Sequence, residues 1–243
     1  MFDYEIKIAK TKEEKESVFR LRFEIFKKEL GKAFSSESLE TDIYDKYCDH
    51  LIVIDHSKNL VIGTYRLLLD YKVNPKIGFY SEKIFDIKNI KKLKERKLEL
   101  SRSCIHKDYR EGIIIHLLWS GIAKYIKENN VRYVFGSVRL NSTEPNYVSS
   151  CFSLVKQKYY ASSQFRVYPL KKCIFKGLDK KLKVTEYKDT FLKLPALVKG
   201  YLRSGVKICG EPAWNPDFGS VVLFIILDIE NMSKTYRRHF LGL

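Results

Sequence analysis

The stretch LELSRSCIHKDYREG, residues 98–112, concentrates side chains that can do chemistry. An alternating apolar strand carries Glu99 and Arg102, and a short turn with Arg110 and Gly112 leads from it into an apolar helix. The first amides of a helix lack internal partners, and the helix dipole is positive there. Such a turn binds phosphate readily, and Arg110 would add charge-assisted hydrogen bonds. The pattern predicts an anion site next to a carboxylate that can act as a base.

The periodicity of apolar residues indicates which elements position these side chains. A capping box, Thr11 with Glu14, predicts a helix that ends near Gly31, and SKN at 57–59 predicts a hairpin turn. Other helices are expected at 111–130, 146–159 and 194–205, and strands at 4–9, 50–55, 60–69, 97–106, 132–140, 206–210 and 220–229. Strands and helices mix without strict alternation, so we expect an α+β (mixed α/β) fold. No linker or repeat is visible, which predicts a single domain over residues 1–243.

Composition limits the class of protein and its partners. The 243 residues carry 45 Lys and Arg against 29 Asp and Glu, a net charge of +16, which favours an acidic partner or an anionic surface. No apolar run reaches about 18 residues, and the charged N-terminus does not read as a signal peptide. Five scattered cysteines without a CxxC pair predict reduced thiols, a cytoplasmic location and no metal site.

Several segments, taken in order, resemble bacterial N-acyltransferases of the ornithine-lipid type, which are related to the acyl-homoserine-lactone synthases within the GCN5-related (GNAT) fold. The segments include GTYRLLL (63–69), LELSRSCIHKDYREG (98–112), FGSVRL (135–140) and LVKGYLRSGVKICGEPAWNPDFGS (197–220). This resemblance implies a central, mostly antiparallel sheet flanked by helices. It also implies transfer of a long-chain acyl or 3-hydroxyacyl group to the α-amine of an amino acid, ornithine above all.

The resemblance further implies which residues line the site. The residues implied for the amine substrate are Arg22, Phe26, Glu40, Asp42 and Asp45; those for acyl transfer are Arg66, Glu99 and Arg102. We expect the backbone amides around Ser103 and Cys104 to stabilise the oxyanion, and Glu99 or an acid of the 40–45 loop to accept the amine proton. Two simpler interpretations stay open, in which Glu99 and Arg102 form a structural ion pair and the acidic loop is a solvated turn.

The turn at Arg110 and Gly112 would hold phosphopantetheine. GNAT acetyltransferases use a turn with a second glycine, which bulk replaces here. A weakened diphosphate cradle favours acyl carrier protein over acyl-coenzyme A as the co-substrate, and no cofactor is expected to stay bound. An acidic carrier also suits the charge of +16.

Other functions remain as alternatives to this interpretation. These are a coenzyme-A-dependent N-acetyltransferase, an acyl-homoserine-lactone synthase and, outside the enzymes, a basic nucleic-acid-binding module. No nucleic-acid-binding motif is visible, so a nucleic acid partner is not expected. The basic stretch 88–97 and the tail 233–243 could contact a carrier protein or an anionic membrane surface, so a peripheral location at the inner membrane face is also expected.

Overall fold

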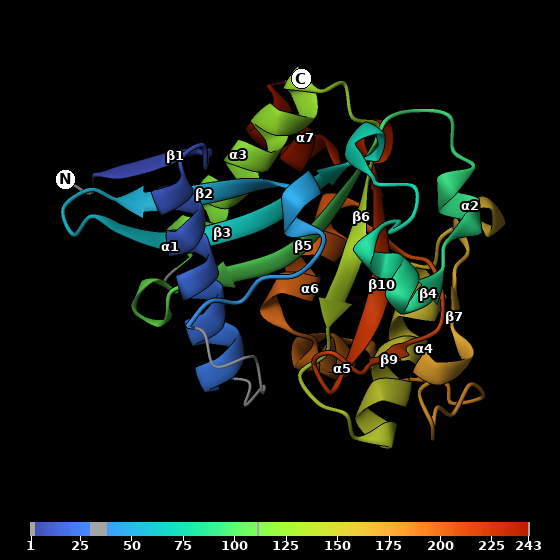
Figure 1. Ribbon diagram of the computed structural model, residues 1–243. Coiled ribbons are helices and arrows are strands. Elements are labelled where there is room, and N and C mark those ends of the chain that lie inside the picture. The colour runs from blue at the N-terminus through green and yellow to red at the C-terminus, as the bar shows by residue number, and fades with distance from the viewer. Residues whose placement is uncertain (1–2, 30–37, 111, 243) are drawn as a thin grey trace. The chain divides into compact units, whose positions relative to one another are not determined.

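The structure is a computed structural model that describes residues 3–29, 38–110 and 112–242 (Figure 1). The chain divides into two compact units. The first comprises Met1–Gly78, Leu98–Val131 and His239–Leu243, and the second comprises Phe79–Lys97 and Arg132–Arg238. A single domain therefore stays a prediction, and each unit is described by itself.

Four antiparallel strands form the sheet of the first unit. They are β1 (Tyr4–Ile8), β2 (Asp49–Asp55), β3 (Leu60–Leu69) and β5 (Lys97–Ile105), and they pair in that order. The turn between β2 and β3 includes 57–59, so the predicted hairpin is confirmed.

Two helices cover opposite faces of this sheet, and Figure 1 shows α1 in front of β2 and β3 with α3 behind them. Helix α1 (Lys12–Phe23) begins at the predicted Thr11–Glu14 capping box and continues as a π-helix, Glu24–Glu29. Gly31, its predicted end, lies outside the described residues. Helix α3 (Ile113–Glu128) packs closely because β3 has a glycine beneath it: a Cβ added to Gly63 would lie 2.8 Å from the Ile114 Cγ2 atom.

The second unit is built on strand β10 (Ser220–Asp228), which pairs antiparallel with β6 (Tyr133–Arg139), β8 (Lys207–Ile208) and β9 (Ala213–Asn215). A separate pair joins β4 (Phe85–Asp86) to β7 (Tyr168–Pro169). Its helices are α2 (Lys88–Lys91), α4 (Pro145–Lys158), α5 (Tyr187–Lys193) and α6 (Ala196–Ser204). Helix α7 (Lys234–Leu241) follows, and buried residues of α4, α6 and β10 share one apolar core.

The antiparallel strands flanked by helices confirm the predicted fold class. Short 3-10 helices occupy Asp45–Tyr47, Asp70–Lys72, Tyr80–Lys83, Lys107–Tyr109, Ser163–Phe165, Lys171–Cys173 and Ile229–Asn231. The sequence patterns missed α5 and α7, because seven or eight residues hold too few turns for a clear period. All five cysteines are buried and free, as predicted. Across the described ranges, no helix is long and apolar enough to cross a bilayer.

Candidate active site

The strand that carries Glu99 and Arg102 has a β-bulge at its centre. In the register of β3 with β5, Thr64 pairs with Cys104 and Arg66 pairs with Ser101, so Arg102 and Ser103 together face only Tyr65. Arg102 has a φ of 51°, in the left-handed region that few residues other than glycine adopt. A bulge of this kind leaves one residue out of the ladder and bends the strand. Its backbone amides are therefore placed differently from those of a regular strand.

Three arginines and three carboxylates form one buried network next to the bulge. Arg22 of α1 donates to Glu40 through Nε, and its Nη1 and Nη2 atoms donate to Asp45 over 2.8 and 3.2 Å. Arg66 of β3 donates from Nη1 to the Oδ1 atoms of Asp42, over 2.6 Å, and Asp45, over 3.1 Å.

Arg102 closes this network from the bulge itself. Its Nε donates to Glu40 Oε1 over 2.9 Å, and its Nη2 donates to Asp42 Oδ2 over 2.8 Å. The loop that carries the acids is anchored by its backbone as well, since the Glu40 N–H donates to the Phe19 carbonyl of α1. The interpretation as a solvated turn is therefore wrong for Glu40 and Asp45, whose side chains are buried, while Asp42 is partly exposed.

Burial makes the network's charges interdependent. The side chains of Arg22 and Glu40 are 0% and 1% exposed, and that of Asp45 is 7% exposed. Burial alone would raise the pKa of Asp45, but Arg22 and Arg66 outweigh it and hold this pKa well below its usual range. The two guanidiniums thus favour the ionised form of Asp45 despite its burial.

Sequence analysis missed two neighbours of the network, His50 and Ser101. The Ser101 hydroxyl accepts a hydrogen bond from Arg66 Nε over 2.9 Å. His50 of β2 packs edge-on against Phe19, and its Nε2 lies 3.9 Å from Asp45 Oδ1. Burial lowers the pKa of His50 to about 4, so its ring is neutral at pH 7. The sequence carried one signal for His50, because it is a polar residue at the start of the apolar run HLIVID and lies on the strand face opposite Leu51.

The remaining predicted residues lie close to this network or to the start of α3. Glu99 is buried on β5 opposite Leu68, and Cys104 is buried on the same strand. Phe26 is buried in the π-helical segment Glu24–Glu29, so it does not continue the regular turns of α1. These residues all belong to the first unit, as do Arg110 and Gly112.

Helix α3 begins as predicted, directly after Gly112. This glycine has a φ of 95° and no side chain caps the helix, so its first amides keep no side-chain partner within the described residues. Arg110 is exposed, and its Nε donates to the Ile105 carbonyl over 3.4 Å, at the end of β5. The bulk predicted to weaken the turn is Ile114, which is fully buried against Gly63. Its side chain is thus directed to the core and does not fill the helix start.

The bulge and the helix start are held by the same strand. Ile114 packs on Gly63, and Tyr65, the residue opposite the bulge, lies two positions further along β3. At about 3.3 Å per residue this separation is roughly 7 Å along the strand. A group bound at the start of α3 can therefore reach the bulge through a short arm.

Known proteins resemble this chain in sequence and in fold. A family model described as an acetyltransferase (GNAT) domain matches residues 21–120. The L-ornithine N(alpha)-acyltransferase of Brucella abortus is 29% identical, over 97% of this chain and 88% of its own length. That of Rhodobacter capsulatus is 28% identical, over 98% and 94%.

Solved structures have the same fold at low sequence identity. FeeM, an N-acyl amino acid synthase from uncultured soil microbes, aligns with a TM-score of 0.55 and 11% identity, over 95% of this chain and 93% of its own. The acyl-homoserine-lactone synthase LasI aligns with a TM-score of 0.53 and 13% identity, over 100% and 96%. The chain therefore has the GNAT fold and is an acyltransferase whose sequence resembles the L-ornithine N(alpha)-acyltransferases along nearly its whole length.

Proposed function

We propose that this chain transfers a long-chain acyl or 3-hydroxyacyl group from acyl carrier protein to the α-amine of an amino acid, with ornithine favoured. The product with ornithine would be lyso-ornithine lipid. The observation that carries this proposal is the similarity to L-ornithine N(alpha)-acyltransferases over 97–98% of the chain. The bulged strand with its buried charges supplies a site for the chemistry.

The reaction needs an attacking amine, an oxyanion partner and a leaving thiol. The neutral α-amine attacks the thioester carbonyl carbon, and the C–N bond forms as the carbonyl electrons move to oxygen. The backbone amides around Ser103 and Cys104, displaced by the bulge, would donate to that oxyanion. The intermediate then expels the pantetheine thiolate, which takes a proton, and the amide remains.

A carboxylate must accept the proton that the amine loses, and two candidates fit. Glu99 is buried on the bulged strand, so it would act at the carbonyl. Of the loop acids, Asp42 has a side chain that is 21% exposed, against 1% for Glu40 and 7% for Asp45. Asp42 is therefore the loop acid best placed to meet a substrate ammonium.

The arginines support this site by holding the acids. Arg22, Arg66 and Arg102 all donate to loop carboxylates, which favours an orienting role over direct binding of the substrate carboxylate. Phe26, buried beyond α1, would act through packing.

The donor proposal rests on charge and on the start of α3. Arg110 and Gly112 would hold the phosphopantetheine phosphate with the first amides of the helix. Because the Ile114 side chain is buried, the missing second glycine gives less reason to disfavour coenzyme A as the donor. The main support for acyl carrier protein is then that carrier proteins are acidic and this chain has a net charge of +16. Exposed Lys88 and Lys91 of α2, and Lys92 directly after it, suit such a partner.

A peripheral location in the cytoplasm, at the inner membrane face, is part of the proposal. An acylated amino acid partitions into lipid, and the cationic surface suits anionic headgroups. Sedimentation with vesicles rich in phosphatidylglycerol, but not with phosphatidylcholine vesicles, would support this location. Equal recovery in both pellets would count against it.

The decisive experiment incubates the protein with long-chain acyl carrier protein and a mixture of amino acids, and determines product masses. We expect the mass of N-acylated ornithine, and a tenfold or greater loss when norvaline, which lacks the second amine, replaces ornithine. A reaction without the protein serves as the control for uncatalysed acylation.

Other outcomes would change the proposal in defined ways. Equal turnover with acyl-coenzyme A would remove the carrier preference, and an acetylated product formed only from acetyl-coenzyme A would favour an N-acetyltransferase. Release of methylthioadenosine from S-adenosylmethionine would identify a lactone synthase. No acylated product with any amino acid, together with salt-sensitive nucleic acid binding, would overturn the proposal.

A further inference from the structure

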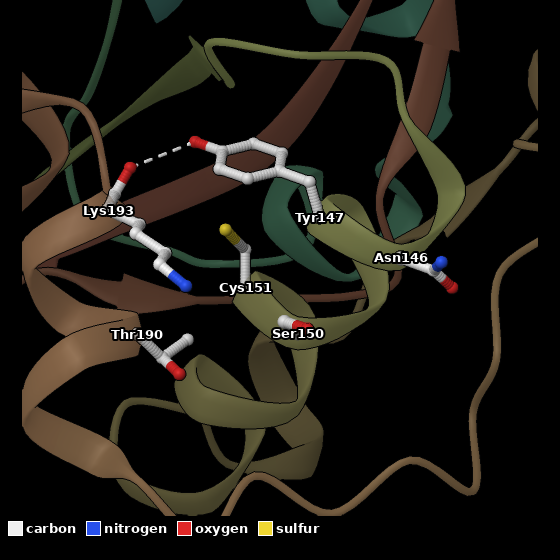
Figure 2. A pocket seen from close by; sticks show the side chains of 6 residues that line it. All are labelled: Asn146, Tyr147, Ser150, Cys151, Thr190 and Lys193. Carbon is white, nitrogen blue, oxygen red and sulfur yellow. Dashed lines mark hydrogen bonds between the residues drawn. The ribbon is translucent and has the colours of Figure 1, made fainter.

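A small cavity in the second unit is lined by none of the candidate-site residues discussed above. It sits between the first two turns of α4 and helix α5, and has a volume of about 250 Å³ (Figure 2). The lining residues are Asn146, Tyr147, Ser150, Cys151, Thr190 and Lys193. They follow helical spacing, so α4 presents one face and α5 presents another.

The lining carries a positive charge and no carboxylate. Figure 2 shows the Lys193 side chain reaching between Cys151 and Thr190. Within the part of the chain that the structure describes, the Lys193 ammonium has no ion-pair partner. The acids nearest along the chain, Glu144 and Asp189, are exposed and do not line the cavity.

The other ionisable groups of the lining cannot neutralise this lysine. Burial raises the pKa of the Cys151 thiol to about 11, and burial raises the pKa of Tyr147 to about 12, so both are neutral at pH 7. The Tyr147 hydroxyl donates to the Lys193 carbonyl over 3.1 Å, which ties α4 to the end of α5 and fixes the walls. The cavity keeps a net charge of +1.

The neutral polar groups of the lining favour an anion. Ser150 offers a hydroxyl within the first two turns of α4, whereas the exposed Asn146 side chain points away from Lys193 (Figure 2). At roughly 30 Å³ per water, the cavity has the volume of about eight water molecules. That is enough for inorganic phosphate or a small carboxylic acid. A diamino acid would bring its own ammonium next to Lys193 and would be repelled.

We propose that this cavity binds a small anion, a phosphate or a carboxylate, with Lys193 as its charge partner and Ser150 as a hydrogen-bond donor. The proposal does not rest on the proposed acyl transfer, because all its residues lie on α4 and α5. The buried thiol at the cavity wall supplies a reporter for it.

The test measures how fast Cys151 reacts with two methanethiosulfonates of similar size and opposite charge, sulfonatoethyl and trimethylammonioethyl. Each forms a mixed disulfide and releases methanesulfinate, and peptide mass mapping separates Cys151 from the other four cysteines. At an effective dielectric constant of about 20, a unit charge a few ångströms away strongly changes the local concentration of a charged reagent. We therefore expect the ratio of the anionic to the cationic labelling rate to fall about tenfold in Lys193→Gln. Lys188→Gln, an exposed charge on the same helix, should keep the wild-type ratio.

Competition then distinguishes the two anions. Phosphate or acetate, compared with sodium chloride at equal ionic strength, should slow labelling of the wild type and raise its melting temperature, with neither effect in Lys193→Gln. Protection by phosphate alone assigns a phosphate ligand, and protection by acetate alone assigns a carboxylate. The same reagent ratio in wild type and Lys193→Gln, or no anion-dependent rise in melting temperature in the wild type, would overturn the proposal.

Discussion

Replacing Asp45 by asparagine should destabilise the first unit strongly at pH 7. Asp45 accepts two hydrogen bonds from Arg22, one from Arg66 Nη1 over 3.1 Å, and one from the Asp42 N–H over 2.8 Å. Asparagine keeps the volume and one acceptor oxygen but removes the charge. The three buried arginines would then face two loop carboxylates. The side chain of Arg22 is 0% exposed, so water cannot hydrate its guanidinium in place of the lost charge.

The expected size follows from that imbalance. Breaking a buried ion pair by removing one partner costs about 3–5 kcal/mol of the free energy of unfolding. Because asparagine keeps one acceptor oxygen, we expect Asp45→Asn to cost about 3 kcal/mol. The pH dependence has a definite sign. The folded pKa of Asp45 lies below its unfolded value, so its stabilisation is present above about pH 4 and is lost as pH falls towards the folded pKa. The difference between wild type and variant should therefore shrink on acidification.

Urea unfolding provides the assay. Trp119 lies in the first unit and Trp214 in the second, so a Trp214→Phe background makes tryptophan fluorescence report on the unit that holds the network. A loss of about 3 kcal/mol shifts the midpoint by about 1 M at the m-values usual for urea.

The control is an exposed pair on the same helix as Arg22. Lys12 and Glu16 lie 4.0 Å apart with side chains 85% and 40% exposed, so Glu16→Gln should change the free energy of unfolding by less than about 0.5 kcal/mol. An Asp45→Asn variant within 1 kcal/mol of wild type at pH 7, or a difference that persists unchanged at pH 3, would refute the reasoning.

Three further substitutions test the bulged strand and the helix that follows it. Glu99→Gln should lower kcat for N-acylation by about 10²–10⁴ with Glu99 as the base, and a loss under tenfold removes it from that role. Gly112→Ala should cost about 1–2 kcal/mol by urea unfolding, because its φ of 95° strains any side chain although a Cβ there meets no atom within 4 Å; no loss would contradict the strain. Gly63→Ala should cost about 1–3 kcal/mol, because its Cβ would lie 2.8 Å from Ile114 Cγ2. Ile114→Ala, which removes the Cγ2 atom, should recover part of the Gly63→Ala loss, and strictly additive losses would argue against this contact.

Local signals along the sequence predicted much of the fold. The Thr11–Glu14 capping box fixes the start of α1, and the hairpin before Leu60 and the end of α6 at Gly205 follow from turn and cap chemistry. These features depend on residues a few positions apart. The bulge at Arg102 could not be predicted in this way, because it is a property of the register between β3 and β5.

The candidate site also has features that the sequence indicates and features that only the folded chain determines. Family resemblance indicated the charged residues, but not which acid meets which arginine. Glu40 is 18 residues from Arg22 and 62 residues from Arg102, so only the folded chain decides that it bridges them. The burial of Ile114 was likewise invisible, because it depends on the absence of a side chain at Gly63 in another strand.

The charged network matters more for geometry than for net stability. Buried ion pairs can often be replaced by apolar residues of similar volume without loss, so stability alone gives little reason for a network of charges most of which are buried. Apolar residues would not supply directed hydrogen bonds. Arg102 holds a left-handed conformation that costs about 1–3 kcal/mol, and two directed hydrogen bonds, to Glu40 and Asp42, keep its side chain in place. Since the backbone at 102 sets where the next amides point, the loop acids that hold the Arg102 side chain also constrain the bulge, and the proposed contact of a substrate ammonium with the partly exposed Asp42 would act on the same hydrogen bonds.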